Sequence, residues 1–375
     1  MHPGAALLFS VLLVLTASGA RASAAEASLA LNEIQLLGSH NSYKQAMDPQ
    51  NMAMLRQVNA PLAESLDYWH LPLAAQLDLG LRKLELDVFY DPAGQLFGRA
   101  GAGGSQFPVL HVQNLDDRSH CANLLHCFAQ LLAWADANPG HLPLFVSFNA
   151  KDEIIDQPGF LRPEPFGEDA WMALDAELRA VVGDRLITPA EVFATGVLRW
   201  PRLADARGRF VLVLDEGGDK RRQYASRWRE RAMFSNLPER APGAAILVVN
   251  DPLTEFDRIQ RLVRAGFIVR TRADADTREA RTGSVERRDA AFASGAQLVS
   301  TDYYLPAQHL GGDYRVVMPG GGIARCNPLL APGCVLNGNG VRSDLEDRDR
   351  VDRDREIAPT SGPRPDTSPA DAAFP

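Results

Sequence analysis

Two carboxylates at alternate positions are the first sign of chemistry in this chain. Glu85 and Asp87 lie in the apolar run 81–88. If this run forms a strand, both carboxylates point to one face of it, while Leu84 and Leu86 point to the other. Two like charges that are buried together need a cation beside them. The pair therefore indicates a divalent-metal site with hard oxygen ligands.

Further polar groups follow the neighbouring apolar runs. His40 and Asn41 come at the end of the first run, and His111 lies in the run 109–112. Metal-assisted phosphodiester chemistry uses such a set, because a cation neutralises the phosphate oxygens while one group accepts a proton and another donates one. Histidine suits both proton transfers at neutral pH. Three other histidines do not follow predicted strands, and we expect them at the surface or in helix packing: His120, His126 and His141.

The elements that must position these residues are predicted by hydrophobic periodicity. Eight apolar runs of strand length recur, at 34–37, 81–89, 109–112, 142–148, 210–214, 244–249, 267–271 and 297–300. Stretches of helical period lie between most of them, at 121–137, 169–182, 220–233, 254–264 and 277–294. This alternation predicts an α/β fold with a parallel sheet, and eight repeats predict a TIM-type (β/α)8 barrel. The glycine-rich stretch 94–104 has no helical period, so we expect a distortion between the second and third strands.

The active site of such a barrel lies at the carboxyl ends of its strands. The fourth run continues into Asn149 and Lys151, and the seventh ends with Arg270 and Arg272. Other strand ends carry Asp215, Asn250 and Asp302. Any one of these could be a polar residue satisfied by its neighbours, but the histidines, amide and carboxylates together favour a catalytic site.

Composition and the two ends of the chain define its organisation. The 375 residues are 46% hydrophobic, enough for one large domain or two smaller ones, and the net charge of −8 argues against nucleic acid as a partner. Residues 1–24 resemble a secretory signal, with an apolar core too short for a membrane anchor. We expect the catalytic domain at 25–336. The segment 337–375 is rich in Arg, Asp and Pro, and we expect it to be a disordered tail.

The four cysteines form two local pairs, Cys121 with Cys127 and Cys326 with Cys334. Local pairs in an exported chain are typical of disulfides, which agrees with a secreted or periplasmic protein. Zinc binding is the alternative, although neither pair has the C-x2-C spacing of common zinc sites.

Six short motifs carry a resemblance to a known family. They are residues 36–43, 66–68, 77–87, 109–112, 138–143 and 270–274. The chain resembles the calcium-dependent bacterial branch of phosphoinositide-specific phospholipase C, within the PLC-like phosphodiesterase superfamily. The resemblance implies a TIM-type barrel and one Ca²⁺. It also implies cleavage of phosphatidylinositol-type phospholipids at a membrane surface to diacylglycerol and an inositol phosphate, usually through a cyclic intermediate. No obligate protein partner is evident.

The resemblance also implies the roles of the histidines and the first metal ligands. His40 matches the histidine that assists attack by the inositol 2-hydroxyl, and His111 matches the acid that protonates the leaving diacylglycerol oxygen. Asn41, Glu85 and Asp87 match three calcium ligands.

The fourth ligand position departs from the family pattern. Asn149 stands where the family has glutamate, so one negative charge is missing, and Asp152 is an alternative ligand. Lys151 matches the basic residue that faces phosphate or inositol. Arg270 and Arg272, in the last motif, are expected to contact the substrate.

Two other functions remain open from the sequence. A glycerophosphodiester phosphodiesterase or phospholipase D-like enzyme shares the histidines and the acidic pair, but it usually has a His-Arg-Gly opening where this chain has Ser39, His40 and Asn41. A catalytically silent barrel that binds phosphoesters is favoured by Asn149 alone.

Overall fold

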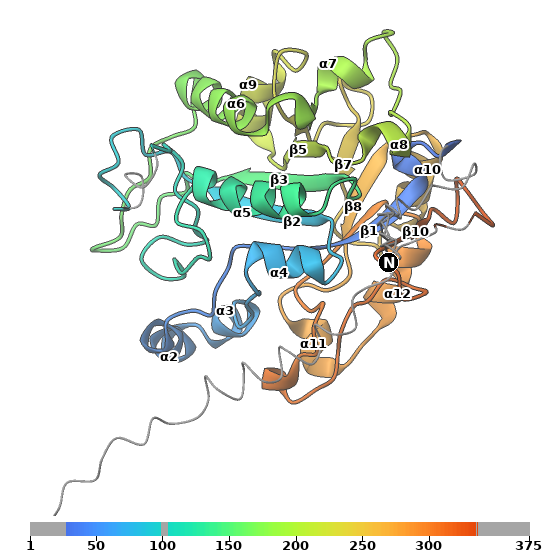
Figure 1. Cartoon of the computed structure of the whole chain (residues 1–375). Coiled ribbons are helices and arrows are strands. Elements are labelled where there is room, and N and C mark those ends of the chain that lie inside the picture. The colour runs from blue at the N-terminus through green and yellow to red at the C-terminus, as the bar shows by residue number, and fades with distance from the viewer. Residues whose placement is uncertain (1–27, 99–103, 335, 337–375) are drawn as a thin grey trace, which may run out of the picture.

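The computed structural model describes residues 28–98, 104–334 and 336, in which parallel strands alternate with helices (Figure 1). The expected signal segment 1–24 and the expected tail 337–375 lie outside the described residues. Among the described helices, none combines the length and apolar character needed to cross a membrane.

Eight parallel strands form the barrel. They are β1 (Ile34–Ser39), β2 (Lys83–Val88), β3 (Leu144–Ala150), β5 (Phe210–Leu214), β6 (Phe234–Ser235), β7 (Ile246–Val248), β8 (Ile268–Arg272) and β9 (Leu298–Thr301). They pair in the order β6, β5, β3, β2, β1, β9, β8, β7, so the first and last strands of the barrel lie side by side. Within the described part of the chain no strand pairing joins β6 to β7. The Asn236 side chain, which follows β6, instead accepts a hydrogen bond from Val248 N of β7 at 3.0 Å. The predicted TIM-type fold is confirmed.

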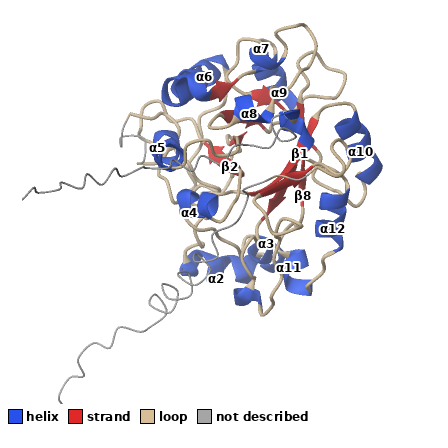
Figure 2. Ribbon diagram, turned by 45° about the vertical axis from the view of Figure 1, so that its right-hand side comes forward, coloured by secondary structure: helices blue, strands red, loops and turns tan. Residues whose placement is uncertain are grey.

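Helices surround the strands in Figure 2, and two further strands extend the sheet. β4 (Leu186–Ile187) pairs with β5, and β10 (Ala324–Cys326) runs antiparallel to β1. The α-helices are α2 (Pro49–Val58), α3 (Ala60–Ser65), α4 (Leu73–Asp78), α5 (Leu124–Ala137), α6 (Glu168–Val182), α7 (Pro189–Val192), α8 (Leu203–Ala206), α9 (Gly218–Ala225), α10 (Phe256–Arg264), α11 (Arg278–Thr282) and α12 (Glu286–Ala293). Short 3₁₀ helices are η1 (Leu31–Glu33), η2 (Gly183–Arg185) and η3 (Gln308–Leu310).

The prediction of a strand at 109–112 is wrong. Val109 forms an isolated antiparallel bridge with Val88, and Phe89 N donates to Pro108 O at 2.9 Å. The chain therefore folds back along the end of β2 instead of entering the barrel. A four-residue apolar run is too short to distinguish a buried loop from a strand. His111 consequently lies in the connection between β2 and α5.

Two predicted helices are shorter than expected. The stretch 220–233 is helical only as far as Ala225, and its end leads into β6. The stretch 277–294 is divided at Gly283, whose φ of 72° ends α11 before α12 begins.

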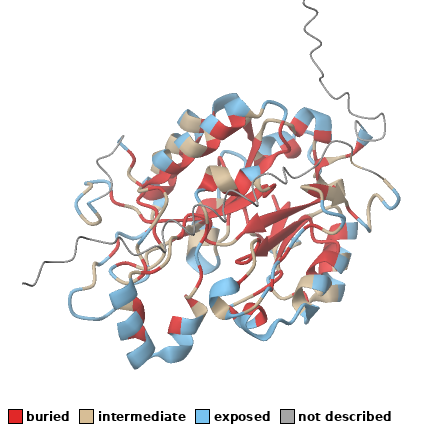
Figure 3. Cartoon of the chain, turned by 60° about the horizontal axis from the view of Figure 1, so that its bottom comes forward, coloured by how far each residue is buried: buried red, intermediate tan, exposed pale blue. Residues whose placement is uncertain are grey.

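The alternation of β2 divides its side chains between two environments. Leu84, Leu86 and Val88 point outward and belong to the same hydrophobic cluster as Phe128 and Leu131 of α5. The strands are buried at the centre of the molecule in Figure 3. The alternate residues of β2 point into the barrel, toward the candidate site. They are Lys83, Glu85 and Asp87.

Both predicted disulfides are present. Cys121 is bonded to Cys127 at the start of α5, and Cys326 to Cys334 beyond the barrel.

Candidate active site at the mouth of the barrel

The end of β1 delivers the first histidine. Gly38 allows β1 to approach β2, because a Cβ at this position would lie 2.3 Å from Lys83 O. His40 follows β1, and its backbone N donates to Thr301 O of β9 at 3.2 Å. Asn41 then has a φ of 46°, a left-handed conformation that asparagine tolerates. This turn aims the Asn41 side chain at Tyr68, whose hydroxyl accepts from Asn41 Nδ2 at 2.8 Å.

His40 is held by a carboxylate from the far end of the chain. Its Nδ1 donates to Asp302 Oδ1 at 3.0 Å, and Asp302 Oδ2 accepts from Arg272 at 2.8 Å. Burial raises the pKa of Asp302, but the charges of His40 and Arg272 outweigh this effect and lower the pKa to about 2. Burial and Arg272 lower the pKa of His40. Asp302 and Glu85 act to raise it, but the net effect is a lowered pKa. Asp302 therefore fixes the proton on Nδ1 and leaves Nε2 free to accept one.

The acidic pair meets Asn149 across two strands. Asp87 lies opposite Asn149 in the β2–β3 register. Asn149 Nδ2 donates to Asp87 Oδ1 at 3.1 Å and to Glu85 Oε1 at 3.3 Å. Glu85 Oε1 is also 3.6 Å from His40 Nε2. Two carboxylate oxygens thus converge on one point beside the first histidine.

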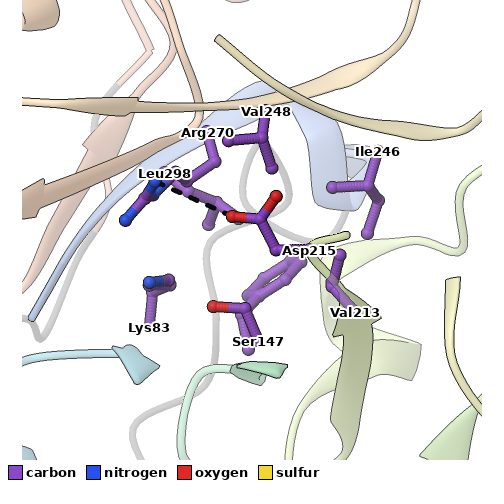
Figure 4. A pocket seen from close by; sticks show the side chains of 9 residues that line it. Lys83, Ser147, Val213, Asp215, Ile246, Val248, Arg270 and Leu298 are labelled. Carbon is purple, nitrogen blue, oxygen red and sulfur yellow. Dashed lines mark ion pairs between the residues drawn. The ribbon is translucent and has the colours of Figure 1, made fainter. Parts of the chain in front are cut away.

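Two buried cations hold the other oxygen of Glu85. Lys83 Nζ lies 2.5 Å and Arg270 NH2 2.9 Å from Glu85 Oε2. Burial opposes the charge of Glu85, but Lys83 and Arg270 outweigh it and hold the pKa of Glu85 well below its usual range. Burial lowers the pKa of Lys83 to about 8. Lys83, Arg270, Ser147 and Asp215 line the same cavity inside the barrel (Figure 4).

The residues expected to contact the substrate have different surroundings. Lys151 Nζ is 3.8 Å from Asp87 Oδ2 and its side chain is 26% exposed, so it is accessible. Arg270 is buried in the barrel, where it also donates to Ser300 Oγ at 3.1 Å. Arg272 is paired with Asp302. The alternative ligand Asp152 accepts from Lys220 at 2.9 Å and from Phe166 N at 3.1 Å.

The second histidine is also held by a carboxylate. His111 Nδ1 donates to Asp116 Oδ2 at 2.8 Å, and the His111 side chain is 16% exposed, whereas that of Asp116 is fully buried. The segment from Val112 to Asp116 forms a tight turn closed by backbone hydrogen bonds, in which Asn114 has a φ of 61°. The turn places the Asp116 carboxylate beside Nδ1 of the imidazole and leaves Nε2 without a partner in this hydrogen bond.

The oxygen-rich set suits a hard cation. The described residues contain no cluster of three or more His, Cys, Asp or Glu side chains that could bind a metal, so amide ligands are needed to complete a site. Glu85 Oε1 and Asp87 Oδ1 already share a positive partner in the Asn149 amide N–H. Rotating that amide about its last bond exchanges nitrogen for oxygen at this point. Two carboxylates with amide oxygens from Asn149 and Asn41 fit Ca²⁺.

Several residues that support the site were not assigned a role from the sequence. They are Lys44, Tyr68, His70, Lys83, Asp116 and Asp302. Asp302 is among the expected strand ends, but nothing local pairs it with His40. His70 Nε2 donates to His40 O at 2.6 Å, and His70 O accepts from His120 at 2.7 Å. His126 is exposed on α5, and His141 donates to Leu142 O at 2.7 Å, so neither contributes to the site.

Comparison with known proteins identifies the family and the fold of the chain. A family model described as phosphoinositide phospholipase C, Ca²⁺-dependent, matches residues 29–328. The fold is similar to a calcium-dependent phosphoinositol-specific phospholipase C from Pseudomonas sp (apo form, myoinositol complex), with a TM-score of 0.51 and 17% identity over 80% of this chain and 96% of the other. A Ca²⁺-dependent phosphatidylinositol-specific phospholipase C from Streptomyces antibioticus gives a TM-score of 0.48 and 17% identity over 74% and 95%.

No curated protein matches the sequence. The Pseudomonas structure supports the barrel fold, and the family model covers most of the chain. The chain therefore belongs to the Ca²⁺-dependent phosphoinositide phospholipases C, which are phosphodiester-cleaving enzymes with Ca²⁺ as their cofactor.

Proposed function

We propose that this chain cleaves phosphatidylinositol-type phospholipids to diacylglycerol and an inositol phosphate by paired histidine catalysis. The observation that carries this proposal is that His40 and His111 each donate Nδ1–H to a buried carboxylate, Asp302 at 3.0 Å and Asp116 at 2.8 Å. In both residues this leaves Nε2 to exchange a proton with the substrate. Two such groups supply a general base and a general acid.

His40 and His111 divide the proton transfers. His40 Nε2 accepts the proton of the inositol 2-hydroxyl as its oxygen attacks phosphorus. The bond from phosphorus to the glycerol oxygen breaks, and protonated His111 donates its Nε2 proton to that oxygen. The products are diacylglycerol and a cyclic inositol phosphate, which water opens when the two histidines exchange roles.

Glu85, Asp87, Asn149 and Asn41 would hold Ca²⁺. When bound, the cation supplies charge neutralisation at the nonbridging phosphate oxygens. Lys151, 26% exposed and beside Asp87, can reach a phosphate oxygen from the solvent side. Lys83 and Arg270 are buried against Glu85 Oε2, where they stabilise the ionised carboxylate and keep Oε1 available.

We propose that the mouth of the barrel faces a lipid surface. Exposed large apolar side chains occur in connections that follow β1, β3 and β7, at Met54, Val58, Leu62, Trp69, Ile154 and Leu253. The first three lie on α2 and α3, next to each other in Figure 1. Apolar groups around a polar mouth favour contact with acyl chains while the headgroup enters the site.

The two disulfides support a secreted or periplasmic location, since such bonds persist in oxidising compartments. The signal segment that this location requires lies outside the described residues.

The test is incubation of the purified protein with vesicles of phosphatidylinositol or phosphatidylcholine, and with soluble glycerophosphodiesters, in Ca²⁺ or chelator. We expect cleavage of phosphatidylinositol in Ca²⁺ alone, with at least a hundredfold loss in H40A and in H111A, since each proton transfer contributes roughly 10² to 10⁴. Preference for glycerophosphodiesters would support the phosphodiesterase alternative. Binding without turnover in every condition would support a silent barrel.

A further inference from the structure

Lys44 is a buried cation that the mechanism above does not use. Its side chain is 0% exposed, and Nζ lies 3.2 Å from Asp116 Oδ2. The same nitrogen donates to Leu66 O at 3.1 Å and Tyr68 O at 2.8 Å. Lys44 therefore joins the connection that carries Tyr68, a neighbour of His40, to the carboxylate that holds His111.

The ion pair and the histidine bond converge on one atom. Asp116 Oδ2 accepts from His111 Nδ1 at 2.8 Å and faces Lys44 Nζ at 3.2 Å. The other oxygen, Oδ1, is buried and has no hydrogen-bond partner among the residues that the structure describes. Lys44 and His111 thus interact with the same carboxylate oxygen. The strength of the interaction between Asp116 and the imidazolium therefore depends on the lysine.

We propose that Lys44 is a positioning residue for His111, which orients Asp116 and offsets part of its charge so that the imidazolium releases its proton to the leaving oxygen. Without the lysine, an uncompensated buried carboxylate would hold that proton too strongly for efficient transfer. This inference rests on the proposed function, because it requires His111 to act as the acid.

The other charged groups near this pair do not replace the lysine. Asp87 of β2 and Asp116 both act on the Tyr43 hydroxyl, and burial, then these carboxylates, raise the pKa of Tyr43 well above its usual range. Lys151 Nζ lies 3.8 Å from Asp87 Oδ2 at this mouth, so that lysine is paired with a different carboxylate. Burial lowers the pKa of Lys44 while Asp116 opposes that change, as expected for a buried ion pair.

The first experiment measures kcat against pH on phosphatidylinositol vesicles at saturating Ca²⁺, for the full chain and for K44M. We expect K44M to lose about tenfold in kcat and its alkaline limb to move to higher pH by about one unit, because Asp116 holds the proton more strongly. A lysine that merely ties the loops together would lower stability or kcat without moving the limb.

A second comparison keeps the test decisive if K44M folds poorly. D116N removes the carboxylate and should move the alkaline limb to lower pH, since Lys44 then faces the imidazole without compensation. K44M/D116N contains neither charge, and its limb should lie at higher pH than that of D116N. The matched control is R231M, which removes a buried cation paired with Asp175 and Glu168 and should lower stability without moving the limb.

The outcomes separate this inference from the proposed function. A wild-type chain that cleaves no phosphatidylinositol, or H111A with full activity, overturns the catalytic assignment and this inference with it. If the wild type is active and folded K44M has its alkaline limb at the same pH as the wild type, only the role of Lys44 is overturned. The same conclusion follows if the limbs of D116N and K44M/D116N coincide.

Discussion

His40 and Asp302 are 262 positions apart in the chain, yet His40 Nδ1 donates to Asp302 Oδ1 at 3.0 Å. The contact forms because β1 and β9 pair in parallel and end together, with Ser39 opposite Thr301. Each strand then places its next residue at the mouth of the barrel. The carboxylate therefore determines which nitrogen of His40 carries the proton.

Replacing Asp302 by Asn should impair catalysis while the fold persists. The amide can present its oxygen or its N–H to the ring, so it no longer enforces the tautomer with Nε2 free. We expect kcat to fall by at least a hundredfold, a typical effect of losing general base catalysis. Phosphatidylinositol turnover, with circular dichroism as the folding control, measures this. Near-normal turnover in folded D302N would mean that the tautomer of His40 is set by another group.

The two acidic residues should respond differently to neutralisation. Asp87→Asn and Glu85→Gln should both abolish Ca²⁺ binding, measured by calorimetry, together with activity. Glu85→Gln also leaves Lys83 and Arg270 without their shared counter-charge, and breaking a buried pair from one side costs about 3 to 5 kcal/mol. Thermal melting should therefore show a large loss for Glu85→Gln and a small one for Asp87→Asn. Unchanged Ca²⁺ affinity in both variants would refute the ligand assignment.

Asn149→Glu should strengthen Ca²⁺ binding. The added carboxylate would face the point where Glu85 Oε1 and Asp87 Oδ1 already converge, so a third negative charge would surround the cation. We expect the dissociation constant to fall by at least tenfold in a calorimetric titration. Asp152→Asn is the matched control, because Asp152 is engaged by Lys220 and Phe166 N. If only the control changes the affinity, the ligand lies three residues later than proposed.

His70 should make the fold sensitive to acid. Burial lowers the pKa of His70 to about 4, so the unfolded chain binds a proton between pH 6.5 and 4 that the native state excludes. Stability is thus unaffected by this group above pH 6.5 and falls as the pH decreases toward 4, by about 2 to 3 kcal/mol at pH 4.5. His70→Gln can still donate to His40 O but does not titrate.

Urea unfolding at pH 7.5 and pH 4.5 measures the effect. The free energy of unfolding should fall less on acidification in His70→Gln than in the wild type, while all other groups titrate alike in both. Equal acid losses would show that His70 is protonated in the native state.

The sequence predicted the parts of the fold that depend on local pattern. Long apolar runs such as 81–89 and 210–214 are strands, because alternation and burial need no knowledge of partners. Short strands were missed, as in β6, since two residues show no period. The opposite error occurred at Val109, where an apolar run packs as a loop.

His40, which we propose as a catalytic residue, follows a strand end as the sequence indicated, but most of the partners within the candidate site could not be predicted. The pairing of His40 with Asp302 and of Glu85 with Arg270 depends on which strands are neighbours, and periodicity does not contain that information. Asp116 is an exception. It lies five residues from His111, and the intervening Asn114 is a turn signal that could have revealed it.

The seam between β1 and β9 also has a consequence for how the enzyme matures. The pairing of these strands joins the two ends of the barrel, a contact of very high sequence separation that carries a large loop-closure entropy. A chain shortened before β9 would contain His40, Glu85 and His111 but not Asp302. We therefore expect a chain that lacks β9 to be inactive, because the proposed base His40 would have no carboxylate to fix its tautomer.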